Sequence, residues 1–168
     1  MVSRMKKIVV INGTGGCGKD TFVELCSKYI SVYNFSSIDK VKEIAKIIGW
    51  TGTKHDKDRK FLSDLKKLTT EYNDMSFESI KEAINIFNNN NFELMFIHIR
   101  EPEEIKRVVE EFKAYSLLIK RKNQELIKTN YSDASVFNYD YDYIIENTTL
   151  EEYEKKAIKF IKELKHDK

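Results

Sequence analysis

The segment Gly13–Thr21 contains the residues of this sequence whose types and spacing are best suited to chemistry. It fits the phosphate-binding pattern G-x-x-x-x-G-K-[ST] at every fixed position except the last, where Asp20 replaces the hydroxyl residue. Glycines let backbone N–H groups point at phosphate oxygens, while Lys19 and the start of a helix supply positive charge. We therefore expect a phosphate-binding loop. Its candidate residues are Gly13, Thr14, Gly15, Gly16, Cys17, Gly18, Lys19, Asp20 and Thr21.

Strand-like and helix-like segments alternate along the chain. The apolar run Lys7–Asn12 precedes the loop and an amphipathic stretch beginning at Phe22 follows it, which is the context that phosphate binding requires. Further strands are predicted over 32–36, 92–99, 115–119 and 143–145, and helices over 38–48, 58–72, 76–88, 102–112 and 149–164. This order predicts an α/β fold, a three-layer α/β/α arrangement around a parallel sheet of roughly five strands, in a single domain over 1–168.

Charged and polar residues follow several of the predicted strands. Carboxyl ends of parallel strands share one edge of a sheet, and ligands bind beyond that edge. We expect Lys19, Arg100 and Arg121 to act there on a transferring phosphoryl group, because that reaction depends on positioning and on neutralising charge. Arg100 and Arg121 each follow directly on an apolar strand. The other residues expected at this edge are Asp20, Asp39, Lys42 and Asn147.

Asp20 stands where a hydroxyl residue usually contacts Mg²⁺, which predicts a magnesium site with an unusual ligand. We expect its carboxylate to make the anionic contact to hydrated Mg²⁺, while the Thr21 hydroxyl turns to the α-phosphate. His98 lies near the end of the strand 92–99, where an acidic residue could support the metal. We favour its interpretation as a hydrogen-bonded core histidine. With His55 and His166 it forms no metal-ligand pattern.

Composition limits the functions to consider. The formal net charge of +2 over 168 residues gives no electrostatic argument for nucleic-acid binding. Only Cys17 and Cys26 are present, which suits a reducing compartment. No apolar stretch has membrane length and no signal-peptide pattern opens the chain. We expect a cytoplasmic protein with a small-molecule substrate, no nucleic-acid or membrane partner, and a monomeric or homodimeric state.

The run Gly18-Lys19-Asp20-Thr21 resembles the loop of deoxynucleoside monophosphate kinases of phage and bacterial type, within the nucleoside monophosphate kinase-like P-loop phosphotransferases. Ile38–Glu43 and Lys57–Leu62 look like that family's acid-x-x-Lys and Arg-x-x-Leu helices. Later segments resemble its strand-end arginine, the strand that opens its lid, its Asp/Ser-rich stretch and its adenine-side loop. They are Ile99-Arg100, Leu118–Arg121, Ser132–Ser135 and Asp142–Asn147.

The resemblance implies ATP and Mg²⁺ as cofactors and a nucleoside or deoxynucleoside monophosphate as phosphoryl acceptor. The acceptor would be bound by residues of a helical insertion at about 38–90, and a small lid would cover 121–136. Asn147 would lie next to the adenine of ATP. Lys19, Arg100 and Arg121 would bridge the two phosphates. The implied acceptor-binding residues are Ser37, Asp39, Lys42 and Arg59.

Other functions fit the same residues. A kinase of another phosphorylated acceptor, of the dephospho-coenzyme A or phosphomevalonate type, remains open because Gly-Lys-Asp occurs outside nucleotide-specific members. A non-catalytic nucleotide-binding module also remains open, because Asp20 and His98 alter the metal site. A switch of the small-GTPase kind is disfavoured, since neither Asn-Lys-x-Asp nor Asp-x-x-Gly occurs. The sequence does not identify the acceptor.

Overall fold

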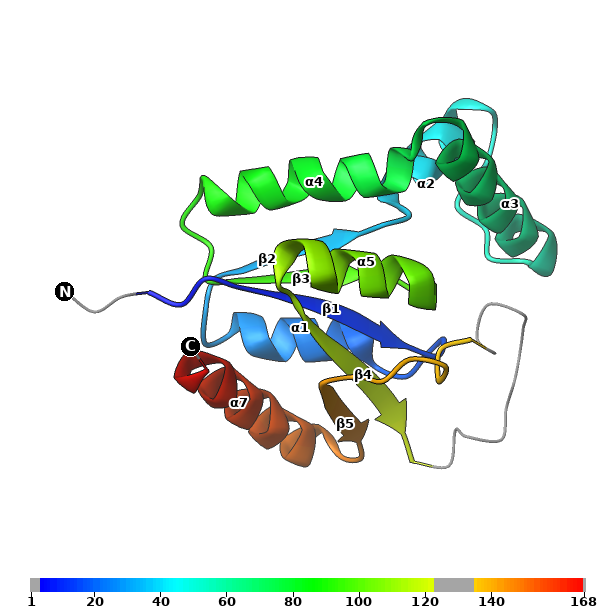
Figure 1. The fold of residues 1–168 in the computed structure, drawn as a ribbon. Helices are drawn as coiled ribbons and strands as arrows, with labels where there is room; N and C mark the ends of the chain where they lie inside the picture. Colours follow the sequence, from blue (N-terminus) through cyan, green and yellow to red (C-terminus); the bar gives the residue numbers. More distant parts are fainter. Residues whose placement is uncertain (1–3, 123–134, 168) are drawn as a thin grey trace.

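Five parallel strands form one sheet, and the strand that leads into the phosphate-binding loop lies at its centre (Figure 1). The computed structural model describes residues 4–122 and 135–167. The strand order is β2-β3-β1-β4-β5, and every neighbouring pair is parallel. The strands are β1 (Lys7–Gly13), β2 (Val32–Ser36), β3 (Leu94–His98), β4 (Tyr115–Arg121) and β5 (Tyr143–Asn147). The predicted parallel α/β sheet is therefore confirmed.

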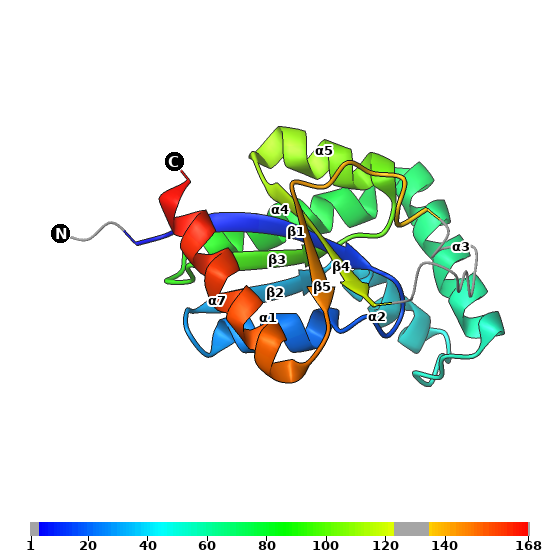
Figure 2. The same ribbon diagram turned by 90° about the horizontal axis from the view of Figure 1, so that it is seen from below.

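Helices cover both faces of the sheet, as Figures 1 and 2 show. On one face, α1 (Lys19–Ser27) and α7 (Leu150–His166) pack on a core that includes Val9, Phe96 and Leu117. On the other, α4 (Met75–Asn88) and α5 (Pro102–Phe112) pack on the alternate strand residues, such as Val10 and Ile97. Because helices cover both faces, successive strand residues enter the two cores in turn, which explains the uninterrupted apolar runs Ile8–Ile11 in β1 and Leu94–Ile97 in β3.

Two further helices, α2 (Asp39–Ile47) and α3 (Asp56–Asn73), extend beyond the carboxyl end of the sheet (Figure 1). They share a small core of Val41, Ala45 and Leu62, against which Trp50 packs. The helix predicted over 58–72 is present. Its apolar residues do not all face inward, however, because Phe61, Leu68 and Tyr72 are 36%, 63% and 85% exposed.

Because all five strands are parallel, the segments that follow them meet at one edge of the sheet. The predicted shared edge is therefore present, and it collects the loop after β1 together with the ends of the other four strands. Most of the predicted lid over 121–136 lies outside the described residues. No helix in the described ranges has the length and apolarity needed to cross a membrane.

Candidate functional site

The phosphate-binding loop connects β1, which ends at Gly13, to α1, which begins at Lys19. Gly18 is the N-cap residue and adopts φ 98° and ψ 26°, a left-handed conformation that favours glycine. No side chain caps this helix end. The positive end of the α1 dipole and the Lys19 side chain therefore add positive charge at the same place.

Residues from the far end of the chain hold this loop in place. Asn147, which ends β5, donates from Nδ2 to the Cys17 carbonyl oxygen at 3.1 Å. Tyr153 of α7 donates from its hydroxyl to the Gly18 carbonyl oxygen at 2.8 Å. A Cβ atom at position 18 would lie 2.4 Å from Asn147 Nδ2, so the contact requires glycine. The loop is thus fixed before any ligand arrives.

Asn12 joins the ends of two neighbouring strands. Its Oδ1 accepts from the Gly13 N–H at 2.9 Å, and its Nδ2 donates to the Arg100 carbonyl oxygen at 3.3 Å and to the Tyr141 hydroxyl at 2.9 Å. Tyr141 in turn donates to the Val136 carbonyl oxygen at 2.7 Å. Because Asn12 is fully buried, these bonds fix the start of the loop relative to the segment that carries Arg100.

His98 is the last residue of β3, at the edge of the sheet where the P-loop begins. Its Nε2 lies 2.7 Å from Asn34 Oδ1, and because that oxygen can only accept, Nε2 carries the proton. Burial and the charges of Lys19 and Lys42 lower the pKa of His98 to about 4, while Asp20 opposes the shift. A neutral imidazole with an accepting Nδ1 therefore stands where an acidic residue could have supported a metal.

Cys17 lies buried in the P-loop. Burial raises the pKa of its thiol, and the charges of Lys19 and Arg100 oppose that shift. The high pKa keeps the thiol protonated and makes Cys17 a small packing residue, in contact with the position that a Cβ atom on Gly13 would occupy.

The residues expected on the acceptor side lie just after β2 and on the two helices that follow it, α2 and α3. The Ser37 hydroxyl is buried and accepts from Lys66 Nζ at 3.1 Å. Asp39 Oδ2 accepts from the Ser36 N–H at 3.1 Å and so closes the turn into α2. Lys42 lies on α2, and its charge contributes to the lowered pKa of His98. Arg59 lies exposed in the first turn of α3.

A pocket of about 520 Å³ lies where β4 and β5 end side by side. Arg121 pairs in register with Asn147, and both line the pocket with Thr148, Thr149 and Glu152. Its volume falls within the range of about 300–1,000 Å³ that is usual for small-molecule sites. The pocket adjoins the loop through Asn147, whose side chain contacts Cys17.

No model of a known protein family and no curated protein sequence matches this chain. Solved structures do resemble it over nearly its whole length. A sugar kinase from Janibacter sp. has 14% identity and a TM-score of 0.55, covering 94% of this chain and 95% of its own. Shikimate kinase from Aquifex aeolicus has 12% identity and a TM-score of 0.53, covering 96% and 99%. Thymidylate kinase from Candida albicans has 12% identity and a TM-score of 0.50, covering 98% and 94%.

The chain has the P-loop kinase fold. Its P-loop fits a nucleoside triphosphate. Gly15 and Gly16 are exposed at the tip of the loop, and a Cβ atom on either would meet nothing within 4 Å. Together with the uncapped start of α1 and the pocket at Asn147, this leaves room for phosphates and a base.

The predicted magnesium site would have few protein ligands. Asp20 is exposed in the first turn of α1. Within 4–122 and 135–167, no group of three or more His, Cys, Asp or Glu side chains could hold a metal ion. This donor set fits an ion that is held mainly by phosphate oxygens and water, which is usual for Mg²⁺ bound with a nucleotide.

Several residues that shape the P-loop edge were not predicted from the sequence. Asn12, Asn34, Tyr141 and Tyr153 act through long-range hydrogen bonds, which no local pattern indicates. Lys66 is 8% exposed on α3 although lysine is rarely buried. One signal was available for Lys66: it lies one helical turn after Leu62, on the face that packs inward.

Proposed function

We propose that this protein transfers the γ-phosphoryl group of ATP to a nucleoside or deoxynucleoside monophosphate. One observation carries most of the proposal: β2, β3 and β1 lie side by side and parallel, so Lys19 in the loop after β1, Lys42 on the helix after β2 and Arg100 after β3 follow neighbouring strands at one edge of the sheet. Cations of the donor side and of the acceptor side are therefore carried by the same sheet edge. Transfer between two phosphates requires this concentration of positive charge.

On the donor side, backbone N–H groups of Gly13–Thr21 would bind the phosphates of ATP, with the base in the pocket beside Asn147. Bound Mg²⁺ supplies charge neutralisation on those phosphates, and Asp20 would hold its water shell. Lys19, Arg100 and Arg121 would stabilise the negative charge of the transferring group.

On the acceptor side, Lys42 and Arg59 favour a substrate that already carries a phosphate, because two cations would otherwise face a neutral hydroxyl compound. Ser37 lies in the turn after β2 and Asp39 begins α2, and both would contact the rest of the acceptor. A monophosphate between α2, α3 and the end of β3 would present its oxygen to the P-loop. Exclusion of water from that space would favour transfer over hydrolysis.

A coupled ADP-release assay with ATP and Mg²⁺ tests the proposal. The acceptors are all ribo- and deoxyribonucleoside monophosphates, dephospho-coenzyme A and phosphomevalonate. We expect one or a few monophosphates to raise turnover well above basal ATP hydrolysis. If only dephospho-coenzyme A or only phosphomevalonate raises turnover, the protein is a phosphotransferase but its acceptor is not a nucleoside monophosphate. If the protein binds ATP but shows only basal hydrolysis with every acceptor, the proposed kinase activity is refuted.

Arg59 and its neighbour Lys60 provide a matched pair for the acceptor side. Both lie exposed in the first turns of α3, and Lys60 pairs with Asp64 one turn later. We expect Arg59→Ala to raise the acceptor KM by about tenfold or more, since a charge-assisted contact to phosphate is lost. Lys60→Ala removes a similar charge and should leave it unchanged. Equal effects of the two variants on the acceptor KM would show that Arg59 does not bind the acceptor.

A further inference from the structure

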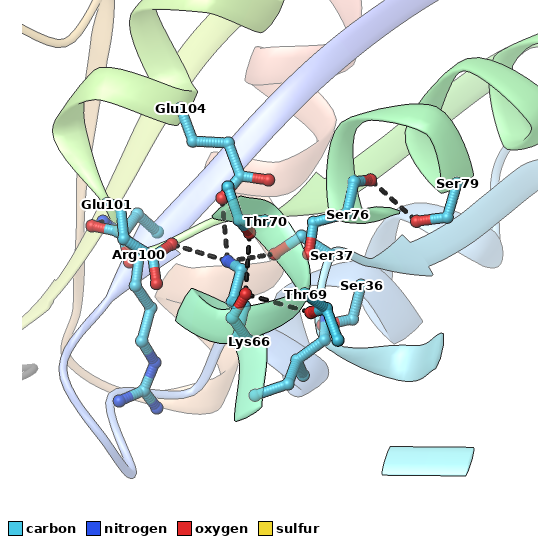
Figure 3. Close-up of polar contacts among 12 residues, drawn as sticks. Ser36, Ser37, Lys66, Thr69, Thr70, Ser76, Ser79, Arg100, Glu101 and Glu104 are labelled. Carbon is cyan, nitrogen blue, oxygen red and sulfur yellow. Dashed lines mark hydrogen bonds and ion pairs between the residues drawn. The ribbon is translucent and has the colours of Figure 1, made fainter. Parts of the chain in front are cut away.

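A buried ion cluster ties α3 to the sheet edge (Figure 3). Lys66 Nζ lies 2.7 Å from Glu101 Oε2, 2.8 Å from Glu104 Oε2 and 3.1 Å from Ser37 Oγ. The Lys66 side chain is 10% exposed, that of Glu104 15% and that of Glu101 49%. All three donors of the ammonium group are therefore used, and they join α3 to two other elements, the turn after β2 that holds Ser37 and the start of α5 that holds Glu101 and Glu104.

Each of these elements carries a residue of the proposed site. Helix α3 carries Arg59, Ser37 belongs to the turn that continues into α2, and Glu101 directly follows Arg100. Lys66 is thus the point at which the acceptor-side helices are fixed to the segment that holds Arg100. Buried ion pairs contribute little net stability compared with apolar side chains of similar size, so stability alone does not account for a lysine here.

The charges of the cluster do not balance. Burial opposes ionisation of both carboxyl groups and raises the pKa of Glu104, whereas at Glu101 the charge of Lys66 and the hydrogen bonds together outweigh burial and lower the pKa. Burial would lower the pKa of Lys66, but Glu104 and Glu101 together outweigh it and raise that pKa. Glu104 Oε1 is buried and has no hydrogen-bond partner among the described residues. The ammonium group of Lys66 therefore offsets the charge of the half-exposed Glu101 carboxylate, with which it pairs at 2.7 Å.

The neutralised carboxylate stands next to Arg100. In Figure 3 the Arg100 side chain extends away from the cluster, while Glu101 turns toward Lys66. Without Lys66, the half-exposed Glu101 would be a negative charge adjoining an arginine that is proposed to bind phosphate. A carboxylate that pairs with an arginine competes directly with a phosphate for the same N–H donors.

We propose that Lys66 is a positioning residue, which holds Glu101 away from Arg100 and fixes α3 against the sheet edge for acceptor binding. This inference rests on the proposed function and concerns the acceptor side of the same site. Lys66 itself does not contact the substrate. Its loss therefore acts on the acceptor more strongly than on ATP.

The test compares Lys66→Met with Lys67→Met, the same change at an exposed neighbour on α3. We expect Lys66→Met to raise the acceptor KM by about ten- to a hundredfold. The ATP KM should change by less than about twofold, because the residues proposed to bind ATP are unchanged in this variant. Lys67→Met should behave as the wild type. An unchanged acceptor KM in folded Lys66→Met would overturn the inference.

Two double variants separate positioning from loss of packing. Lys66→Met/Glu101→Gln removes the carboxylate next to Arg100, and Lys66→Met/Glu104→Gln removes the more deeply buried one. We expect only the Glu101 change to restore most of the acceptor KM. Equal rescue by both, or rescue by the Glu104 change alone, would show a merely structural role. These comparisons remain decisive if Lys66→Met by itself does not fold.

The wild-type protein in the same assay distinguishes this inference from the proposed function. If the wild type turns over and the Lys66 variants have the same acceptor KM, only the proposed role of Lys66 is refuted. Lack of turnover with every acceptor would overturn the proposed function and this inference with it. Trp50, the single tryptophan, packs on the core shared by α2 and α3, so its fluorescence reports directly whether Lys66→Met displaces α3.

Discussion

The neutral state of His98 makes the stability of the folded chain depend on pH. Burial and the charge of Lys19 lower its pKa from the ordinary 6.5 to about 4. The unfolded chain therefore takes up a proton first as the pH falls, and protonation favours unfolding. This contribution is complete above about pH 6.5 and is lost progressively toward pH 4. Between about pH 7 and pH 5, the two pKa values give a loss of about 2 kcal/mol in the free energy of unfolding.

Urea unfolding of the ligand-free protein at about pH 7 and about pH 5 measures this loss. His98→Gln keeps a donor for Asn34 and cannot be protonated, so its free energy of unfolding should fall by about 2 kcal/mol less than that of the wild type. His166→Gln, at an exposed position in the last turn of α7, is the matched control and should follow the wild type. Equal pH dependence in all three proteins would refute the buried neutral state of His98.

Two further predictions concern the P-loop. Gly18→Ala places a Cβ atom 2.4 Å from Asn147 Nδ2 at φ +98°, and it should cost about 1–3 kcal/mol in urea unfolding. Gly15→Ala, which meets nothing within 4 Å, should cost far less, and equal costs would contradict the tight contact at position 18. Asp20→Ala should weaken the apparent Mg²⁺ affinity in the ADP-release assay by about tenfold, because a carboxylate that holds the water shell is lost. Unchanged Mg²⁺ dependence and turnover would exclude Asp20 from the metal site.

The sheet and its connections could be predicted because their signals are local. Five apolar runs, each bounded by polar or glycine-containing turns, became the five strands within a few residues. Thr149 was expected to begin the last helix, and its side chain accepts from the Glu152 N–H at 3.2 Å. Parallel order then follows from the helices between strands, so the shared edge was predictable without knowledge of any contact.

The orientation of α3 and the supports of the P-loop could not be predicted in the same way. Helical spacing places Phe61, Leu62 and Leu68 on one broad apolar stripe, and only packing decides that Leu62 faces inward. Lys66 is buried because Glu101 and Glu104, far away in the sequence, come close to it in the fold. Such pairings depend on tertiary structure and leave no trace in periodicity.

The hydrogen bonds from Asn147 and Tyr153 to the P-loop have a consequence for the order in which the protein is made. The nucleotide-binding motif lies within the first 21 residues, yet Asn147 and Tyr153 are separated by 130 and 135 residues from the carbonyl groups they support. A growing chain therefore displays the complete motif long before its supports leave the ribosome. The two hydrogen bonds to the loop can therefore form only after β5 and α7 have been made and have docked, which makes completion of the loop a late event in folding.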